Sequence, residues 1–311
     1  MSYFEQTKSG ESRFWSWILV ISMTVFAWFF LSMILAIPLT VIASSLDVAL
    51  IEEFATSQNG ETRDPALQLM GASPIAYALI LLTFPAALVG LFVGQKFVHL
   101  RTIRSLHTAA NKFRFSRAFQ GFILTWMVLG IFSIAGNAVG FIDVEFVFNG
   151  KRFWAFAFVS LLFIPLQSAT EEIAFRGYFN QGLTHFLKSK WIAFIITSLF
   201  FMALHLSNPE ALEGAASGTL PVVMSSYFFF GFAMCLIVWI DDGLETAIGI
   251  HAGNNCFAAI IMNYENSVLP TPSIFLTGSD PVKDAISTFI VLAVLVFIFW
   301  SWRDGSRQLA L

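Results

Sequence analysis

Long apolar segments separated by short polar ones dominate the chain. Eight of them carry almost no charge: residues 14–43, 75–95, 118–142, 153–170, 191–206, 220–240, 246–264 and 285–302. A helix needs ~20 apolar residues to cross the hydrocarbon core of a bilayer, and most of these segments are long enough. Because backbone groups in lipid must be bonded within the segment, helices are expected. The pattern predicts an all-α, polytopic membrane bundle of about eight transmembrane helices.

The connections between these segments are expected to be irregular, in particular 207–219, which contains Asn208-Pro209, and the proline-containing 264–283. No composition change marks a soluble module, so residues 1–311 are interpreted as a single membrane domain. The first apolar run is too long for the h-region of a signal peptide and is expected to be a retained span.

Composition agrees with a membrane protein. Only 12% of the residues are charged, against about 25% in soluble domains. The net charge of −3 and the absence of a long basic run argue against nucleic acid as a partner. The cysteines, Cys235 and Cys256, both lie in apolar segments, where they are expected to be small buried side chains rather than disulfide or zinc ligands.

The distribution of basic residues orients the bundle. The 99–117 loop holds five of them, whereas the 44–74 loop holds only Arg63. By the positive-inside rule the 99–117 loop is cytoplasmic, and eight spans then place both termini in the cytoplasm. Lys151 and Arg152 run against this bias because they fall on the outer side.

Two adjacent carboxylates, Glu171 and Glu172, end the apolar segment 153–170. A charged side chain costs ~2.5–3.5 kcal/mol at the bilayer centre, so it needs a partner. Glu172 and Arg176 are spaced i, i+4 and share a helix face, so this pair can neutralise itself. Glu171 lies about 100° round the helix and must face something else.

Of the five histidines, only His205 and His251 lie in apolar segments. A buried carboxylate can act as a general base on water, with a histidine orienting that water. A second histidine and an amide can donate hydrogen bonds to a developing oxyanion. We therefore expect Glu171 to act with His205 and His251 with Asn255, while Glu172 and Arg176 support the site.

Each residue also has a plain structural interpretation. Paired glutamates can form a solvated helix end, and a lone intramembrane histidine can simply bond a neighbouring helix, which contributes ~0.6 kcal/mol on average. Each of these interpretations is reasonable for one residue alone. Together they are weak, because the spans hold almost no other ionisable residues. The H-E-x-x-H signature of zinc metalloproteases is absent.

Three motifs in order resemble one family: Glu171-Glu172-x-x-x-Arg176, Phe201-x-x-x-His205 and His251-x-x-x-Asn255. The chain is similar here to the CAAX protease and bacteriocin-processing (CPBP, or ABI) family, which includes the type II CAAX prenyl endopeptidases. The resemblance implies a catalytic core at 150–260, within an eight-helix bundle. It implies a glutamate-type endopeptidase with these residues in the roles given above and no cofactor. Zinc held by Glu171, His205 and His251 is the alternative.

The depth of these residues conflicts with this arrangement. If the fourth span ends near residue 170, Glu171 and His251 lie near the cytoplasmic end and His205 lies near the outer end. The three meet only if the fifth span is tilted or offset, or if 177–190 forms an interfacial helix.

The expected function is hydrolysis of a peptide or membrane-anchored protein, without prenylation, in a bacterial inner membrane. A non-catalytic immunity or interaction protein with the same fold is the alternative, and a proton-coupled transporter is a third. A transporter predicts inverted repeats, and none is apparent in the sequence.

Overall fold

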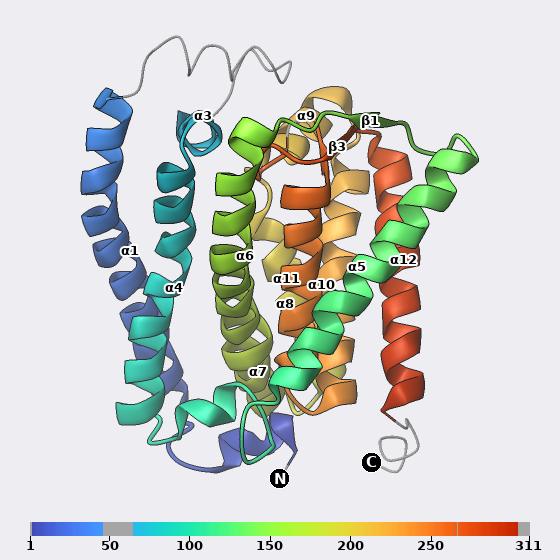
Figure 1. The fold of residues 1–311 in the computed structure, drawn as a ribbon. Helices are drawn as coiled ribbons and strands as arrows, with labels where there is room; N and C mark the ends of the chain where they lie inside the picture. The colour runs from blue at the N-terminus through green and yellow to red at the C-terminus, as the bar shows by residue number, and fades with distance from the viewer. Residues whose placement is uncertain (1, 46–64, 266, 304–311) are drawn as a thin grey trace.

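A computed structural model describes residues 2–45, 65–265 and 267–303. Helices account for most of this part of the chain (Figure 1). The α-helices are α1 Phe14–Ser45, α3 Pro65–Ala72, α4 Pro74–Phe97, α5 Phe115–Ala138, α6 Gly150–Glu172, α7 Asn180–Leu187, α8 Lys190–Leu204, α9 Pro209–Ser217, α10 Leu220–Asp241, α11 Glu245–Cys256 and α12 Pro281–Trp302. Two 3-10 helices, η1 Tyr3–Lys8 and η2 Ile103–Leu106, and two π-helices, η3 Ile173–Phe179 and η4 Phe257–Ile261, complete the helical elements.

The predicted all-α membrane bundle is confirmed. Each of the eight apolar segments forms a helix, and six helices in the described ranges are long and apolar enough to cross a membrane. The count rises to seven if α8 and α9, which are bent by 87° relative to each other, form one broken span. The number of full spans is below eight because α8 has 15 residues and α11 only 12.

The fourth helix is much longer than expected. The carboxylates do not end it, because the chain continues through η3 and α7 as one apolar run, Gly150–Leu187. Polar residues that follow the two carboxylates are buried by tertiary contacts. Asn180 and Gln181 are fully buried, and Gln181 Nε2 donates to the Ser105 carbonyl at 2.8 Å.

This extension removes the conflict in depth. Glu172 lies 15 residues before Leu187, about 22 Å from the lower end of that helix at 1.5 Å per residue. After a turn at Lys188, which has a left-handed backbone, α8 runs back alongside for 15 residues and ends at Leu204. His205 therefore reaches nearly the same height as Glu172, without a tilted span or an interfacial helix.

The expectation of irregular structure at 207–219 was wrong, since Pro209–Ser217 forms α9. Pro209 occupies the first turn, where its missing N–H costs nothing. Gly218 ends the helix with a φ of 79°, a conformation that favours glycine. These residues were interpreted as loop signals, but they act as helix start and stop signals.

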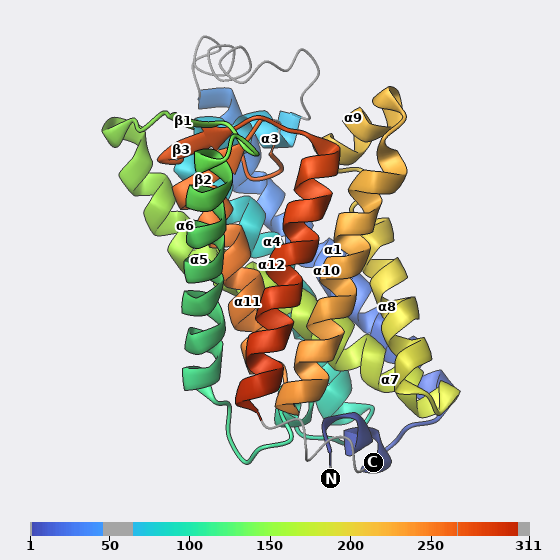
Figure 2. The ribbon, with the colours of Figure 1, turned by 90° about the vertical axis from the view of Figure 1, so that its right-hand side faces the viewer.

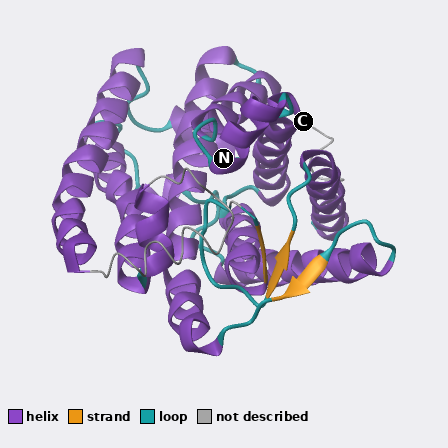
Figure 3. Cartoon of the chain, turned by 90° about the horizontal axis from the view of Figure 1, so that it is seen from above, coloured by secondary structure: helices purple, strands orange, loops and turns teal. Residues whose placement is uncertain are grey.

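Three short strands were not expected. They are β1 Val144–Phe146, β2 Met262–Tyr264 and β3 Phe275–Thr277. β3 is central, pairing antiparallel with β1 and parallel with β2. The sheet lies at the end of the bundle that also carries α3 and α9 (Figures 1 and 3).

The opposite end of the bundle gathers η1, the 99–117 loop, the α7–α8 turn and the last residues of α12 (Figures 1 and 2). The predicted cytoplasmic basic residues that are described thus share one end, while Lys151, Arg152 and Lys283 lie near the other. Arg63 and Arg307 lie outside the described residues.

Helix α11 is the innermost of the helices that carry the candidate residues. It packs against α5 and α6, and every residue from Glu245 to Gly253 is buried. Close packing against α5 depends on small residues, as is usual between membrane helices. A Cβ atom at Gly249 would lie 1.9 Å from the Ala118 carbonyl oxygen, and the Trp126 indole donates to the Gly253 carbonyl at 2.9 Å.

We expect Gly249→Ala to force α11 away from α5, because backbone atoms cannot yield as a flexible side chain can. The expected loss of stability is about 1–3 kcal/mol, as for other overpacked sites. Gly130→Ala on α5 is the matched control, since nothing lies within 4 Å of a Cβ there. Thermal unfolding in detergent should show a lower midpoint for Gly249→Ala alone, and equal midpoints for the two variants would contradict the close crossing.

Candidate active site

A buried charge cluster joins α6, η3 and α11. The Arg176 Nη1 donates to Glu172 Oε1 at 3.0 Å, and the His251 Nδ1 lies 2.8 Å from the same oxygen. Glu172 and Arg176 are fully buried and the His251 side chain is 4% exposed. Because the carboxylate of this ion pair only accepts, the hydrogen of the contact belongs to His251 Nδ1. Glu172 therefore holds both the guanidinium and the imidazole.

The ring of Phe201 occupies the centre of the aromatic contacts around this cluster. The Arg176 guanidinium lies over the ring at 4.3 Å from its centroid. The His205 and His251 rings lie 4.5 Å and 6.2 Å from it, centroid to centroid. A cation over an aromatic face in a desolvated site is stabilised by the ring quadrupole. The motif phenylalanine thus contacts three of the motif side chains.

Glu171 presents its two carboxylate oxygens to different partners. Gln167, one turn earlier on α6, donates from Nε2 to Oε1. Oε2 is buried, has no hydrogen-bond partner among the described residues, and lies 3.8 Å from His251 Nε2. That separation is too long for a direct hydrogen bond and short enough for a water to bridge. One oxygen is held while the other faces an imidazole.

The same glutamine links Glu171 to the amide from α11. Asn255 Nδ2 donates to Gln167 Oε1 at 3.4 Å, and Asn254 Nδ2 donates to Asn255 Oδ1 at 3.1 Å. Gln167 was missed at the sequence level because it carries no charge. Its signal was an amide in an apolar span four residues before Glu171, on the same helix face.

His205 follows the last residue of α8, and its ring is held on three sides. Its Nδ1 lies 2.7 Å from the Phe201 carbonyl oxygen, which only accepts, so Nδ1 carries the hydrogen. The neutral ring then has an unprotonated Nε2. Tyr227 stacks on the ring at 4.3 Å. Glu171 and His251 lie near enough to act on this imidazole electrostatically.

The structure thus brings the segments of all three motifs to one height in the bundle. Arg176 contacts Glu172, and His251 contacts both Glu172 and Glu171. Asn255 joins them through Gln167, and His205 joins them through Phe201. Asn255 and His251 share a face of α11 but bond different partners.

Comparisons with known proteins point to the same segment. The family model described as "Type II CAAX prenyl endopeptidase Rce1-like" matches residues 151–257. The predicted resemblance is confirmed. The "Uncharacterized protein YyaK" of Bacillus subtilis (strain 168) is 28% identical over 232 residues, which cover 71% of this chain and 74% of that protein. No solved structure matches.

The matched segment holds all of the motif residues, and its similarity to a protease family together with the apolar helices supports a membrane-embedded protease at a coarse level. The matched range begins within α6 and ends in η4. It therefore leaves out α1, α4, α5 and α12, although α4, α5 and α12 pack directly around the core.

The matched segment, residues 151–257, shows no arrangement of donor side chains typical of a metal site. In the described part of the chain, no group of three or more His, Cys, Asp or Glu side chains is arranged to hold a metal ion. The Nδ1 atoms of His205 and His251 are held by Phe201 and Glu172, so only their Nε2 atoms could be ligands. No step below is routed through a metal.

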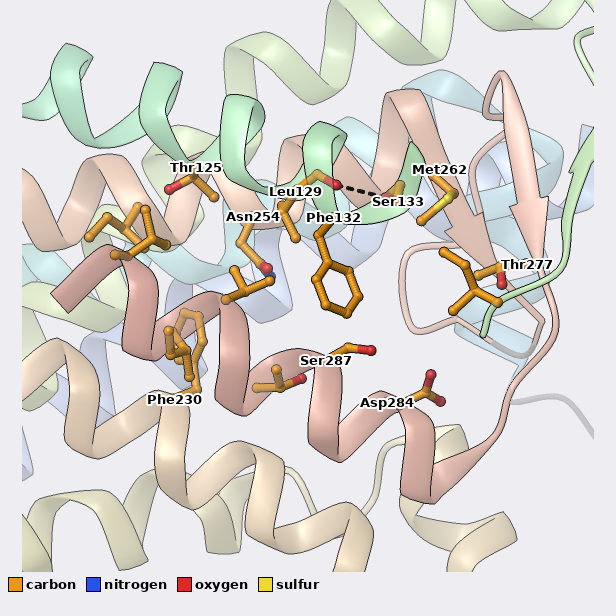
Figure 4. A pocket seen from close by; sticks show the side chains of 16 residues that line it. Thr125, Leu129, Phe132, Ser133, Phe230, Asn254, Met262, Thr277, Asp284 and Ser287 are labelled. Carbon is orange, nitrogen blue, oxygen red and sulfur yellow. Dashed lines mark hydrogen bonds between the residues drawn. The ribbon is translucent and has the colours of Figure 1, made fainter. Parts of the chain in front are cut away.

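A cavity of about 150 Å³ adjoins the core between α5, α11 and α12 (Figure 4). The Phe230 ring lines it and packs on His251 at 5.0 Å. Asn254 also lines it and connects it through Asn255 and Gln167 to Glu171. Its deeper walls are apolar, including Leu129, Phe132, Val291, Leu292 and Leu295, and Asp284 and Ser287 add polar groups.

We expect Arg176→Met to destabilise the fold strongly, because it leaves Glu172 with only His251 as a partner. Breaking a buried ion pair in this way costs about 3–5 kcal/mol. The double variant Glu172→Gln with Arg176→Met removes both charges and should recover part of the loss. Unfolding midpoints of the single and double variants in detergent test this. If the double variant loses as much stability as the two single variants together, or more, the pairing is refuted.

Proposed function

We propose that this chain hydrolyses a peptide bond of a peptide or membrane-anchored protein, with Glu171 as general base and no metal. One observation carries the proposal: Glu171 Oε2 is buried, unpartnered among the described residues, and 3.8 Å from His251 Nε2. A carboxylate left with one free oxygen beside an imidazole suits a water-activating role better than a structural one. Glu172 also has one buried oxygen without a hydrogen bond, but Arg176 compensates its charge, whereas Glu171 faces only an imidazole.

The proposal also includes one proton shared by Glu171 and His251, which the charge balance of the cluster favours. Glu171 and Glu172 carry two negative charges against one guanidinium, Arg176. A net charge buried in a low-dielectric interior is unfavourable, so the Glu171–His251 pair is expected to hold one proton. When that proton is on His251, the imidazolium donates from both nitrogens and Glu171 is free to accept.

In the proposed reaction a water lies against Glu171 Oε2. The water oxygen attacks the carbonyl carbon while one of its protons passes to Glu171. The second water hydrogen bonds to His205 Nε2, which is the acceptor left by the Nδ1–H bond to Phe201. Gln167 keeps the other oxygen of Glu171 in place, so the direction of proton transfer is fixed.

The tetrahedral intermediate places a negative charge on the former carbonyl oxygen. Asn255 Nδ2 and the imidazolium Nε2–H of His251 are the expected donors, and such donors act most strongly in a dry site. Asn254 donates to Asn255 Oδ1, and Asn255 Nδ2 donates one hydrogen to Gln167, so the second Nδ2 hydrogen is left for the oxyanion. Glu171 then returns its proton to the amide nitrogen as the C–N bond breaks, which releases an amine and a carboxylic acid.

We propose that residues 150–260 form the catalytic core of a single membrane domain in a bacterial inner membrane, with both termini cytoplasmic. The shared location of the basic residues at one end of the bundle supports this orientation. The cavity beside Phe230 and Asn254 offers room for an apolar side chain of the substrate. We expect the substrate to lack a prenyl group.

Glu171→Gln tests the proposal directly. Loss of a general base typically lowers a rate by 10²–10⁴-fold, about the range expected here. Membranes carrying the wild-type chain or Glu171→Gln should be compared by mass spectrometry of peptide termini. At least one terminus should disappear in the variant.

Glu265→Gln is the control, because that side chain is exposed and outside the core. If both variants give the wild-type set of termini, and the wild-type phenotype persists in Glu171→Gln, the chain is a non-catalytic immunity or interaction protein.

Metal content is a separate prediction. We expect purified protein to contain well under one zinc per chain and to keep its activity after dialysis against a chelator. Elemental analysis of wild type and His251→Ala checks this. Stoichiometric zinc that is lost in His251→Ala would instead assign Glu171, His205 and His251 as ligands.

A further inference from the structure

A second polar cluster lies beside the first and reaches the His205 ring through Tyr227. It consists of Asn208 and Glu210 at the start of α9, Tyr227 on α10 and Tyr264 on β2. None of these residues belongs to the three motifs. The two clusters meet at the imidazole of His205.

The His205 ring lies against two aromatic rings. Phe201 lies 4.5 Å away in a tilted arrangement at 44°, and Tyr227 lies 4.3 Å away and stacks on it at 28°. The Phe201 carbonyl fixes Nδ1 at 2.7 Å, so rotation about the side-chain bonds is opposed by one hydrogen bond and two ring faces. Stacked aromatic pairs contribute beyond their buried area.

Tyr227 is itself anchored through its hydroxyl. The hydroxyl donates to Glu210 Oε1 and accepts from Asn208 Nδ2 at 2.8 Å. Tyr264 also donates to Glu210 Oε1, at 3.3 Å. A hydrogen bond to a carboxylate is roughly twice as strong as one between neutral groups. Glu210 therefore joins α9, α10 and β2 at one oxygen.

The path of the chain explains why this anchor acts on His205. His205 lies at the 87° bend between α8 and α9, where tighter turn hydrogen bonds, such as His205 N–H to the Met202 carbonyl at 3.0 Å, replace those of the α-helix. Asn208 is the N-cap of α9, and Glu210 lies in its first turn, where a negative charge is favoured by the helix dipole. The segment that follows His205 thus returns, through Tyr227, to hold the His205 ring.

We propose that Tyr227 is a positioning residue for His205 and that Glu210 holds Tyr227 in the stacked position. Tyr227 touches neither Glu171 nor the expected water, so its effect passes through the imidazole. The placement of the ring stands on geometry alone, whereas its consequence for rate rests on the proposed function. A 1 Å misplacement of a reacting group can cost about 10²-fold in rate.

The first experiment observes the ring itself. Full-length protein labelled with ¹⁵N-histidine in lipid nanodiscs gives nitrogen signals that distinguish the Nδ1–H tautomer from an averaged ring. The His205 signals are assigned by comparison with His205→Gln. We expect wild type to show the Nδ1–H pattern. Tyr227→Phe, which lacks the hydroxyl that Glu210 holds, and Tyr227→Leu, which also lacks the ring, should show an averaged ring.

Matched variants separate positioning from general packing. Phe229→Leu removes a ring two residues away on α10 at a position that is 41% exposed, so the His205 pattern should not change. Glu210→Gln keeps an acceptor for the tyrosine hydroxyl and should retain the pattern, whereas Glu210→Leu should lose it. If Tyr227→Leu fails to fold, the Glu210 pair decides the question. A wild-type pattern in Tyr227→Leu or Glu210→Leu overturns the proposal.

The second experiment uses a synthetic peptide that spans the cleavage site revealed by the Glu171→Gln comparison. Tyr227→Leu should lower kcat by about 10–100-fold, in keeping with a misplaced reacting group, and change KM by less than threefold. Glu210→Gln, which keeps an acceptor for the tyrosine hydroxyl, should keep most of the rate. An averaged His205 ring with unchanged kcat would contradict the positioning role. If no peptide is cleaved even by wild type, the proposed function fails, and the nanodisc spectra still decide where the ring is held.

Discussion

Charge compensation inside the membrane is the constraint on which the rest of this structure depends. A glutamate at the level of Glu172 cannot stay ionised in hydrocarbon without a partner, and Arg176 one turn away provides it. The pair is not merely tolerated, because the same carboxylate oxygen also orients His251. Phe201 then covers the guanidinium and contacts both imidazoles. The neutral pair thereby forms a rigid support for Glu171, which Gln167 bonds at one oxygen and which faces His251 with the other.

Departures from regular helix accompany each candidate segment. The π-helix η3 begins directly after Glu172, η4 begins two residues after Asn255, and His205 lies at the C-terminal cap of α8. π-Turns are rare and occur preferentially at functional sites. Each irregularity changes the direction of the side chains near it, which a continuous α-helix would space evenly. The close crossing at Gly249 fixes α11 against α5, so these orientations are held within a packed frame.

Much of this could be predicted from the sequence, because apolar segments and intramembrane charges are strong local signals. The helices and the Glu172–Arg176 pairing follow from them. The length of the fourth helix could not be predicted, since the Asn180 and Gln181 side chains are buried and donate to residues distant in the chain. Pro209 and Gly218 were misinterpreted because the same residues mark loops and helix ends. Gln167 and Tyr227 were missed because an uncharged side chain in an apolar segment gives no signal in the sequence. Their roles follow only from contacts with Glu171 and His205.

The most direct measurement is a crystal or cryo-EM structure with a peptide aldehyde built on the cleaved sequence. The hydrated aldehyde carries two hydroxyl groups on one carbon and imitates the tetrahedral intermediate. Our account predicts one hydroxyl within hydrogen-bond distance of Glu171 Oε2 and the other within reach of Asn255 Nδ2 and His251 Nε2. An inhibitor bound with neither hydroxyl near Glu171, or a Glu171 side chain turned towards lipid, would contradict it.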